Sequence, residues 1–133
     1  MIHTKSALNF INELKESLWL GLDLKKITQY YDTSLIGDES GRLIRFGDIT
    51  QFFQARASKQ LPAFVHIDIE DCLAEERKIF IRINGRFEDG SSNRAHLSYH
   101  LNNQNKVIRL WSLLEDPRKN AEDPHIHAIK FLV

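Results

Sequence analysis

The sequence predicts an α+β fold, in which three N-terminal helices cover the apolar face of an antiparallel sheet; if that sheet is strongly curved, it wraps around the helices to form a cone. In the first half of the chain, apolar residues recur at the three-to-four spacing of a buried helix face. In the second half they alternate with polar residues, as on strands with one buried face. Helices followed by a run of strands are typical of an α+β plan. The three helices are the only cover that the sequence offers for the apolar face of the sheet.

The first two helices are expected between residues 6 and 31. The first covers residues 6–20, and Gly21 suits a left-handed stop. Asp23 is expected to cap a short second helix over residues 24–31, with Leu24, Ile27 and Tyr31 on one side. The buried stripe of the first helix comprises Ala7, Phe10, Ile11, Leu14 and Leu18.

A short hairpin and a third helix are expected next. Two β-type runs flank the segment 37–41, whose two glycines, aspartate and serine favour a turn. Asp48 and Gln51 have capping-box spacing at the start of the third helix, and Pro62 marks its stop. The buried stripe of this helix comprises Ile49, Phe52, Phe53 and Ala57.

Four long strands are expected to form an antiparallel meander over the rest of the chain. Three of them alternate, and their inward residues are Val65, Ile67 and Ile69, then Ile79, Ile81, Ile83 and Phe87, then Ala95, Leu97, Tyr99 and Leu101. The last strand, "KVIRLWSLLED", is apolar on both faces, and only Arg109 and Ser112 interrupt its apolar run. A strand covered on both faces has this composition.

Length and composition indicate one soluble domain. The chain has 133 residues, and its 18 Lys and Arg residues balance its 18 Asp and Glu residues. Without a basic excess, neither a nucleic-acid partner nor a membrane surface is expected. The single cysteine, Cys72, forms no internal disulfide, and the N-terminus lacks the features of a signal peptide, so a cytoplasmic protein is expected. One domain should cover residues 1–133, with its core at about 6–116 and a C-terminal strand or tail at 117–133.

Four stretches carry a resemblance to a known superfamily. They are "LDLKKITQYYDTSLIGD", "GRLIRFGDITQFFQ", "EDCLAEERKIFIRINGRFE" and "HLNNQNKVIRLWSLLED". In order and spacing they resemble the SnoaL-like and ketosteroid-isomerase-like branch of the nuclear transport factor 2-like superfamily, which has a cystatin-like cone fold. The resemblance covers most of residues 24–116.

The resemblance implies how the last strand is oriented. In this superfamily the concave face of the sheet lines a pocket, and the convex face often packs on another subunit. The cavity side would then hold Ile108, Leu110, Ser112 and Leu114. The outward side would hold Val107, Arg109, Trp111 and Leu113, covered either by a partner subunit or by the C-terminal segment of the chain. A homodimer formed through the sheet is therefore expected.

The resemblance also implies a ligand pocket with one catalytic candidate, Asp38. This residue follows the second helix as the general base of the isomerases does, and a carboxylate removed from water becomes a usable proton carrier near neutrality. Alternatively, Asp38 caps backbone amides in an exposed turn. The implied pocket wall comprises Phe10, Leu14, Tyr31, Ile81, Leu97, Tyr99, Leu110, Ser112 and Leu114.

Other parts of the isomerase site are missing. Leu97 occupies the position of the acid that donates a hydrogen bond to the oxyanion, and Phe10 or Leu14 that of the first-helix tyrosine. True ketosteroid isomerase activity is therefore not expected, because an oxyanion without donors loses its main electrostatic stabilisation. Tyr99 and Ser112 either offer hydroxyls to the cavity or are satisfied core groups.

No metal or cofactor is expected. His96 and His100 share a strand face but lie roughly 13 Å apart along it, and His125 and His127 have no clear third ligand. The polar residues of the convex face should form ion pairs, solvated or within a dimer interface. These residues are His66, Asp68, Arg82, His96, His100 and Arg109.

Two functions follow as expectations. The first is binding of a small, mostly apolar molecule in the cone, with isomerase- or cyclase-type acid–base chemistry. The alternative is a non-catalytic module that dimerises or binds another protein through the outer face of the sheet. A deep cavity reached by the Asp38 carboxylate would favour the first function, whereas a cone filled by the chain's own aromatic side chains would favour the second.

Overall fold

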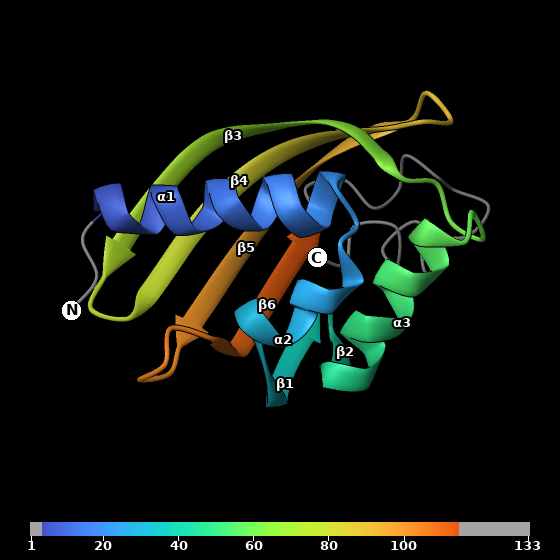
Figure 1. Cartoon of the computed structure of the whole chain (residues 1–133). Coiled ribbons are helices and arrows are strands. Elements are labelled where there is room, and N and C mark those ends of the chain that lie inside the picture. Colours follow the sequence, from blue (N-terminus) through green and yellow to red (C-terminus); the bar gives the residue numbers. More distant parts are fainter. Residues whose placement is uncertain (1–3, 115–133) are drawn as a thin grey trace.

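The computed structural model describes residues 4–114, which form helices packed on one face of a curved, open sheet (Figure 1). Helix α1 continues as a π-helix over Lys15–Leu20, and a 3-10 turn over Leu24–Lys26 precedes α2. The helices are α1 (Thr4–Leu14), α2 (Ile27–Tyr30) and α3 (Phe46–Ala57). The strands are β1 (Tyr31–Glu39), β2 (Arg42–Arg45), β3 (Phe64–Glu75), β4 (Lys78–Phe87), β5 (Ser92–Leu101) and β6 (Val107–Leu114).

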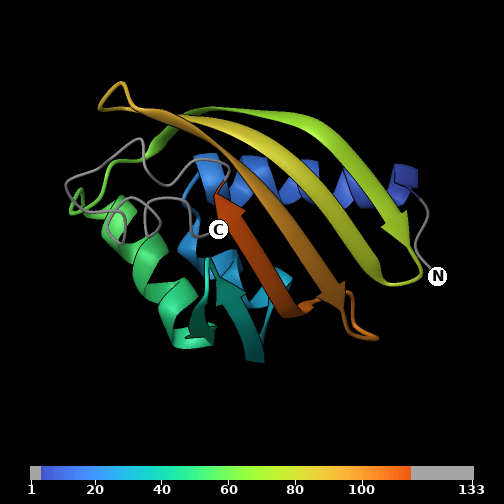
Figure 2. The same ribbon diagram turned by 180° about the vertical axis from the view of Figure 1, so that it is seen from behind.

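The six strands form one sheet in the order β2-β1-β6-β5-β4-β3, and the helices lie on its concave face (Figures 1 and 2). The expected antiparallel meander is confirmed for β3 to β6. One pair differs, because β1 and β6 are parallel. The chain leaves β2 through α3, begins again at the far edge with β3, and returns strand by strand to β1. Its last strand, β6, lies beside β1 and runs in the same direction, so this pair is parallel.

The first helix buries the expected stripe but ends differently. Ala7, Ile11, Leu14 and Leu18 are buried. Gly21 has right-handed dihedral angles, and the left-handed conformation belongs to Leu22 at φ 50°. The glycine is needed for space instead, because a Cβ at this position would collide with the Glu16 carbonyl oxygen and lie 2.9 Å from that of Ser17.

The third helix begins earlier than expected and buries a charged residue. Asp48 lies in its first turn, where Oδ2 accepts a hydrogen bond from the Arg45 amide at 2.8 Å. Ala57, expected in the buried stripe, is exposed, and the fully buried residue at this end of the helix is Arg56. Ile49, Phe53 and Arg56 lie on one helix face, since they are four and then three residues apart.

Two β-bulges, one in β3 and one in β6, change which residues of these strands face inward. A register shift between Phe64 and His66 leaves Val65 exposed, although alternation placed it inside. A second shift beside Leu101 turns Val107 inward and leaves Ile108 half-buried, opposite to the expected orientation. The remaining inward residues of β4 and β5 are buried as expected.

The hairpin turn is shorter than the five-residue segment suggested. It consists of Ser40 and Gly41, and Gly37 belongs to β1. A Cβ on Gly37 would lie 2.7 Å from the Leu110 carbonyl oxygen, so this glycine allows β1 and β6 to approach closely.

Some expectations concern residues outside the described range. They are the C-terminal strand or tail at 117–133, the pair His125 and His127, and the side chain of Leu114. Within residues 4–114, none of the helices has the length and apolar character that crossing a bilayer requires.

Candidate functional site

The residues expected to line an interior pocket lie in the closely packed core. Leu14, Tyr31, Tyr99 and Leu110 are fully buried. Ile81, Leu97 and Ser112 are nearly so, and Phe10 is half-buried with its ring 5.7 Å from that of Tyr30. A ligand-sized void inside the cone would leave accessible area on its wall, so these side chains do not border an interior one. Their role as a ligand wall stays a prediction, and a ligand could enter only by displacing them.

Aromatic side chains from four elements fill the centre of the cone. The Tyr31 ring lies 6.1 Å from Phe53 and 6.4 Å from Tyr99, measured between ring centroids. Trp19 Nε1 donates a hydrogen bond of 3.4 Å to the Tyr31 hydroxyl, which also bonds to the Tyr99 hydroxyl. The Tyr99 hydroxyl is therefore a satisfied core group, one of its two expected roles. This filled interior is the arrangement that favours a non-catalytic module.

Burial controls the ionisation of the groups around this aromatic centre. It raises the pKa of Tyr31 to about 12, against the opposing effects of hydrogen bonds from Trp19 and Tyr99 and the charge of Arg56. Burial likewise raises the pKa of Tyr99 well above its usual value. Arg56, whose guanidinium lies 5.0 Å from the centre of the Phe64 ring, has its pKa lowered by burial to about 9. It therefore keeps its charge at neutral pH inside the core.

The raised pKa of Tyr31 predicts a specific loss of stability at alkaline pH. The unfolded chain ionises this tyrosine near pH 10 and the folded chain near pH 12, so its stabilising effect is complete below pH 10 and is lost as the pH rises towards 12. From pH 9 to 11, the free energy of unfolding of the wild type should fall by about 1 kcal/mol more than that of Tyr31→Phe. Burial, the main cause of the pKa shifts of Tyr99 and Arg56, is present in both proteins. Urea denaturation followed by circular dichroism measures the difference, and equal pH slopes would contradict it.

The Ser112 hydroxyl does not take the second of its two expected roles, that of a hydrogen-bonded core group. Ser112 Oγ is buried and has no hydrogen-bond partner among residues 4–114. The backbone carbonyl of Ser112, in contrast, accepts a hydrogen bond of 2.8 Å from the Ser40 amide. Glu39, which is also buried, lies opposite Ser112 in the register of β1 and β6. The end of β6 thus carries polar groups close to the hairpin turn.

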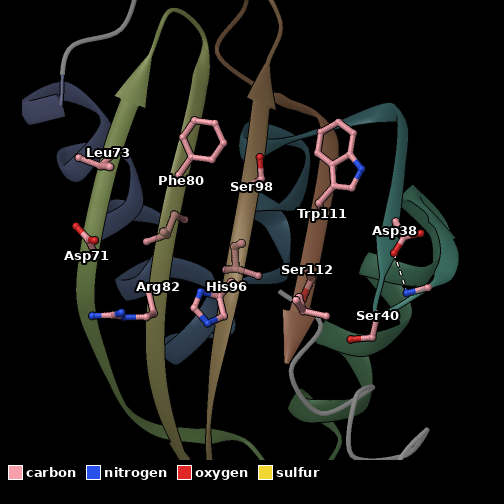
Figure 3. Close-up of a pocket in the computed structure, with 14 residues that line it drawn as sticks. Asp38, Ser40, Asp71, Leu73, Phe80, Arg82, His96, Ser98, Trp111 and Ser112 are labelled. Atoms are coloured by element: carbon pink, nitrogen blue, oxygen red, sulfur yellow. Dashed lines mark hydrogen bonds between the residues drawn. The ribbon is translucent and has the colours of Figure 1, made fainter. Parts of the chain in front are cut away.

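A groove of about 450 Å³ lies on the opposite, convex face of the sheet (Figure 3). It crosses the strands from the β1–β2 turn to β3, and Figure 3 views it with the helices behind the sheet. Three of the residues expected to line the interior pocket, Ile81, Leu97 and Ser112, also border this groove. Its outward-facing lining includes Asp38, Asp71, Leu73, Phe80, Arg82, His96, Ser98, Trp111 and Leu113.

One row of side chains forms the apolar edge of the groove. Strand register places Leu73 beside Phe80, Phe80 beside Ser98, and Ser98 beside Trp111. The same row continues through Asp38 to Leu43 on β2. We call Leu43, Trp111, Phe80 and Leu73 the apolar row. Of these four residues, only Trp111 was expected on the outward side of its strand, and only the register brings the four together across the sheet.

Asp38 lies in this row and not inside the cone. Its Oδ1 accepts a hydrogen bond of 2.8 Å from the Gly41 amide, which is the turn-capping role considered from the sequence. Its β1 neighbours Gly37 and Glu39 are buried, and Asp38 points to the other face, at the end of the groove (Figure 3). The role of Asp38 as a general base stays a prediction, and any substrate for it would bind on the outer face.

Part of the convex face is ion-paired, as expected. Glu70 accepts a hydrogen bond of 2.9 Å from Arg94 and lies 3.5 Å from Arg82. The hydrogen bond from Arg94 lowers the pKa of the Glu70 carboxyl. His66 and Asp68 approach to 2.8 Å. Within residues 4–114, no three His, Cys, Asp or Glu side chains gather as a metal site would require.

Comparison with known proteins supports the fold. No protein-family model matches the chain, and no curated protein matches it significantly in sequence. Among solved structures, a SnoaL-like polyketide cyclase from Agrobacterium tumefaciens is 13% identical, with a TM-score of 0.68 over 92% of this chain and 98% of that one. A SnoaL-like protein of unknown function from Burkholderia thailandensis is 18% identical, with a TM-score of 0.68 over 87% and 100%.

A de novo designed protein is similar to the same degree. It has the nuclear transport factor 2 fold and is 11% identical, with a TM-score of 0.67 over 91% of this chain and 93% of that one. Because a designed protein and a cyclase match equally well, the likeness establishes the architecture and leaves the activity to the site. The chain has the nuclear transport factor 2-like fold.

Proposed function

We propose that the chain is a non-catalytic protein-binding module whose working surface is the outer face of the sheet. The observation that carries this proposal is the exposure of large apolar side chains beside the groove. Trp111 is 50% exposed, Phe80 41%, and Leu73 and Leu113 59% each. Apolar side chains gathered on one face mark interaction sites, and tryptophan is prominent among residues that dominate binding energy.

The packing of the interior supports the same proposal. A catalytic or ligand-binding cone needs room beside its polar groups, and here the centre is occupied by Trp19, Tyr31, Phe53 and Tyr99. The one carboxylate proposed for catalysis lies on the other face of the sheet. The outer face therefore offers the accessible surface, while the interior provides stability.

Short random peptides displayed on phage test this function directly. Peptides selected on the wild type should bind Trp111→Ala at least about tenfold more weakly, because the substitution removes the largest apolar contact of the face. Leu8→Ala is the matched control, since Leu8 is an exposed apolar residue on α1. Fluorescence polarisation with the synthetic peptides gives the affinities. Peptides that bind both variants as tightly as the wild type would place the binding surface elsewhere.

A second candidate function is binding of a small, mostly apolar molecule in the outer groove. The groove volume of about 450 Å³ lies within the usual range for ligand pockets, and the lining combines apolar walls with the Asp38 carboxylate. Lipophilic carbonyl compounds should then raise the Tm of the wild type in a saturable manner, and Trp111→Ala should abolish the shift. Asp38→Asn should keep the binding and lose any turnover. If no compound shifts the wild type, this candidate fails.

A further inference from the structure

Basic side chains form a second row across the outer face, next to the apolar row. Strand register places Lys78 beside His100, and His100 beside Arg109. Ile36 on β1 connects Arg109 to Arg45 on β2. We call Arg45, Arg109, His100 and Lys78 the basic row. Three of its members are exposed and His100 is half-buried, so the row is accessible to a partner that covers the apolar row.

The basic row is not neutralised within the described part of the chain. Arg82 and Arg94 on the same face share Glu70, whereas none of the four basic-row side chains forms an ion pair with residues 4–114. Glu75 lies opposite Lys78 in the register but forms no ion pair with it. Strands β4, β5 and β6 contain no aspartate or glutamate at all. Although the net charge of the chain is zero, the Lys and Arg residues of β4, β5 and β6 are not balanced by any acidic residue on these three strands.

Resting on the protein-binding function proposed above, we infer that the partner is an acidic, apolar segment of another protein. Its apolar side chains would contact Trp111 and Phe80, and its carboxylates would contact Arg109 and Lys78. Two rows of different character lie side by side, so the partner should place its acidic residues on one side of its apolar ones. Charge complementarity of this kind increases both the association rate and the specificity of binding.

A second copy of the chain is less suitable as the occupant. In the described part of the chain, the carboxylates that line the groove are Asp38 and Asp71 on β3, and Asp38 already accepts a hydrogen bond from the Gly41 amide. When two sheets stack with their strands aligned, the central strands of one copy face the central strands of the other. The basic row would then meet basic or neutral residues, and like charges in contact oppose association.

Nucleic acid also fits less well. Leu43, Leu73 and Leu113 make up much of the exposed apolar area and offer no planar face on which a base could stack. Asp38 and Asp71 would face the phosphates of a strand that followed the groove. A peptide with branched apolar side chains matches the aliphatic part of the surface better.

Peptides selected on the wild type test the inference. We expect them to contain aspartate or glutamate next to large apolar residues, and to bind the double variant Lys78→Glu/Arg109→Glu at least about tenfold more weakly. Arg86→Glu is the matched control, because it reverses a charge on the same face of β4, near the end of the strand opposite to Lys78. A peptide with its acidic residues changed to lysine should prefer the double variant to the wild type. Binding to the wild type should weaken as salt rises from about 50 to 300 mM.

The outcomes separate the inference from the function on which it rests. Peptides that need Trp111 but ignore both the double variant and salt would overturn the acidic partner and leave the binding module intact. Peptides that ignore Trp111, or failure to select any, would overturn both. Sedimentation velocity of the chain alone tests a second copy as the occupant, and polarisation with fluorescein-labelled oligouridine tests nucleic acid. Self-association or oligonucleotide binding that Lys78→Glu/Arg109→Glu abolishes would overturn the protein segment in favour of that occupant.

Discussion

The free energy of unfolding is expected to fall by about 2–5 kcal/mol when Leu110 is replaced by alanine. Leu110 is fully buried on β6, in the centre of the sheet. Removing its side chain loses apolar burial and leaves a cavity, because the neighbouring side chains are held by the strands on either side. The result also tests the interior directly, since Leu110 was expected to line a ligand pocket. Truncating a residue that borders a void would lower the free energy of unfolding by less.

Leu113→Ala is the matched control for this prediction. It makes the same chemical change on the same strand, three residues away, but Leu113 is 59% exposed on the outer face. Its effect should stay within about 0.5 kcal/mol, as for other surface substitutions. Guanidinium denaturation followed by circular dichroism measures both variants. Similar, small effects at Leu110 and Leu113 would mean that the cone is loosely packed, and the interior ligand pocket would regain support.

The fold could be predicted from the sequence because its signals are local. The alternation in β4 and β5 identified each inward residue, and the helical stripe of α1 was equally clear. The bulges at Val65 and Ile108 could not be predicted. One extra residue hardly alters the composition of a strand, but it moves the residues beyond it to the opposite face of the sheet. The parallel pairing of β1 with β6 depends on the path of the whole chain.

The site was harder to predict because it depends on distances across the molecule. Whether Tyr31, Phe53 and Tyr99 fill a cone or line it is decided by side-chain volumes in three dimensions. The apolar and basic rows exist only through the register between strands, which a single sequence does not specify. Arg56 was different, because its spacing from Ile49 and Phe53 placed it on the buried face of α3. It was missed because only apolar residues were assigned to that face.

The second large effect is expected at Arg56. Replacing it by alanine should lower the free energy of unfolding by about 2–4 kcal/mol, because a long, fully buried side chain is lost and its place in the core is left empty. The substitution also removes the guanidinium from the face of the Phe64 ring and from the neighbourhood of the Tyr31 hydroxyl. Buried polar contacts of this kind are worth more than exposed ones, since water does not replace them.

Arg42 provides the comparison, because it makes the same kind of contact at the surface. Its guanidinium lies 5.6 Å from the centre of the Phe52 ring, and its side chain is one-third exposed. Arg42→Ala should cost no more than about 1 kcal/mol, since water and salt weaken the contact. Urea denaturation at neutral pH gives both values. Equal costs would show that Arg56 reaches solvent in the folded protein, and the lowered pKa attributed to its burial would then have no cause. A clear excess at Arg56 would show that this buried side chain stabilises the cone, so the interior of the protein supports the fold.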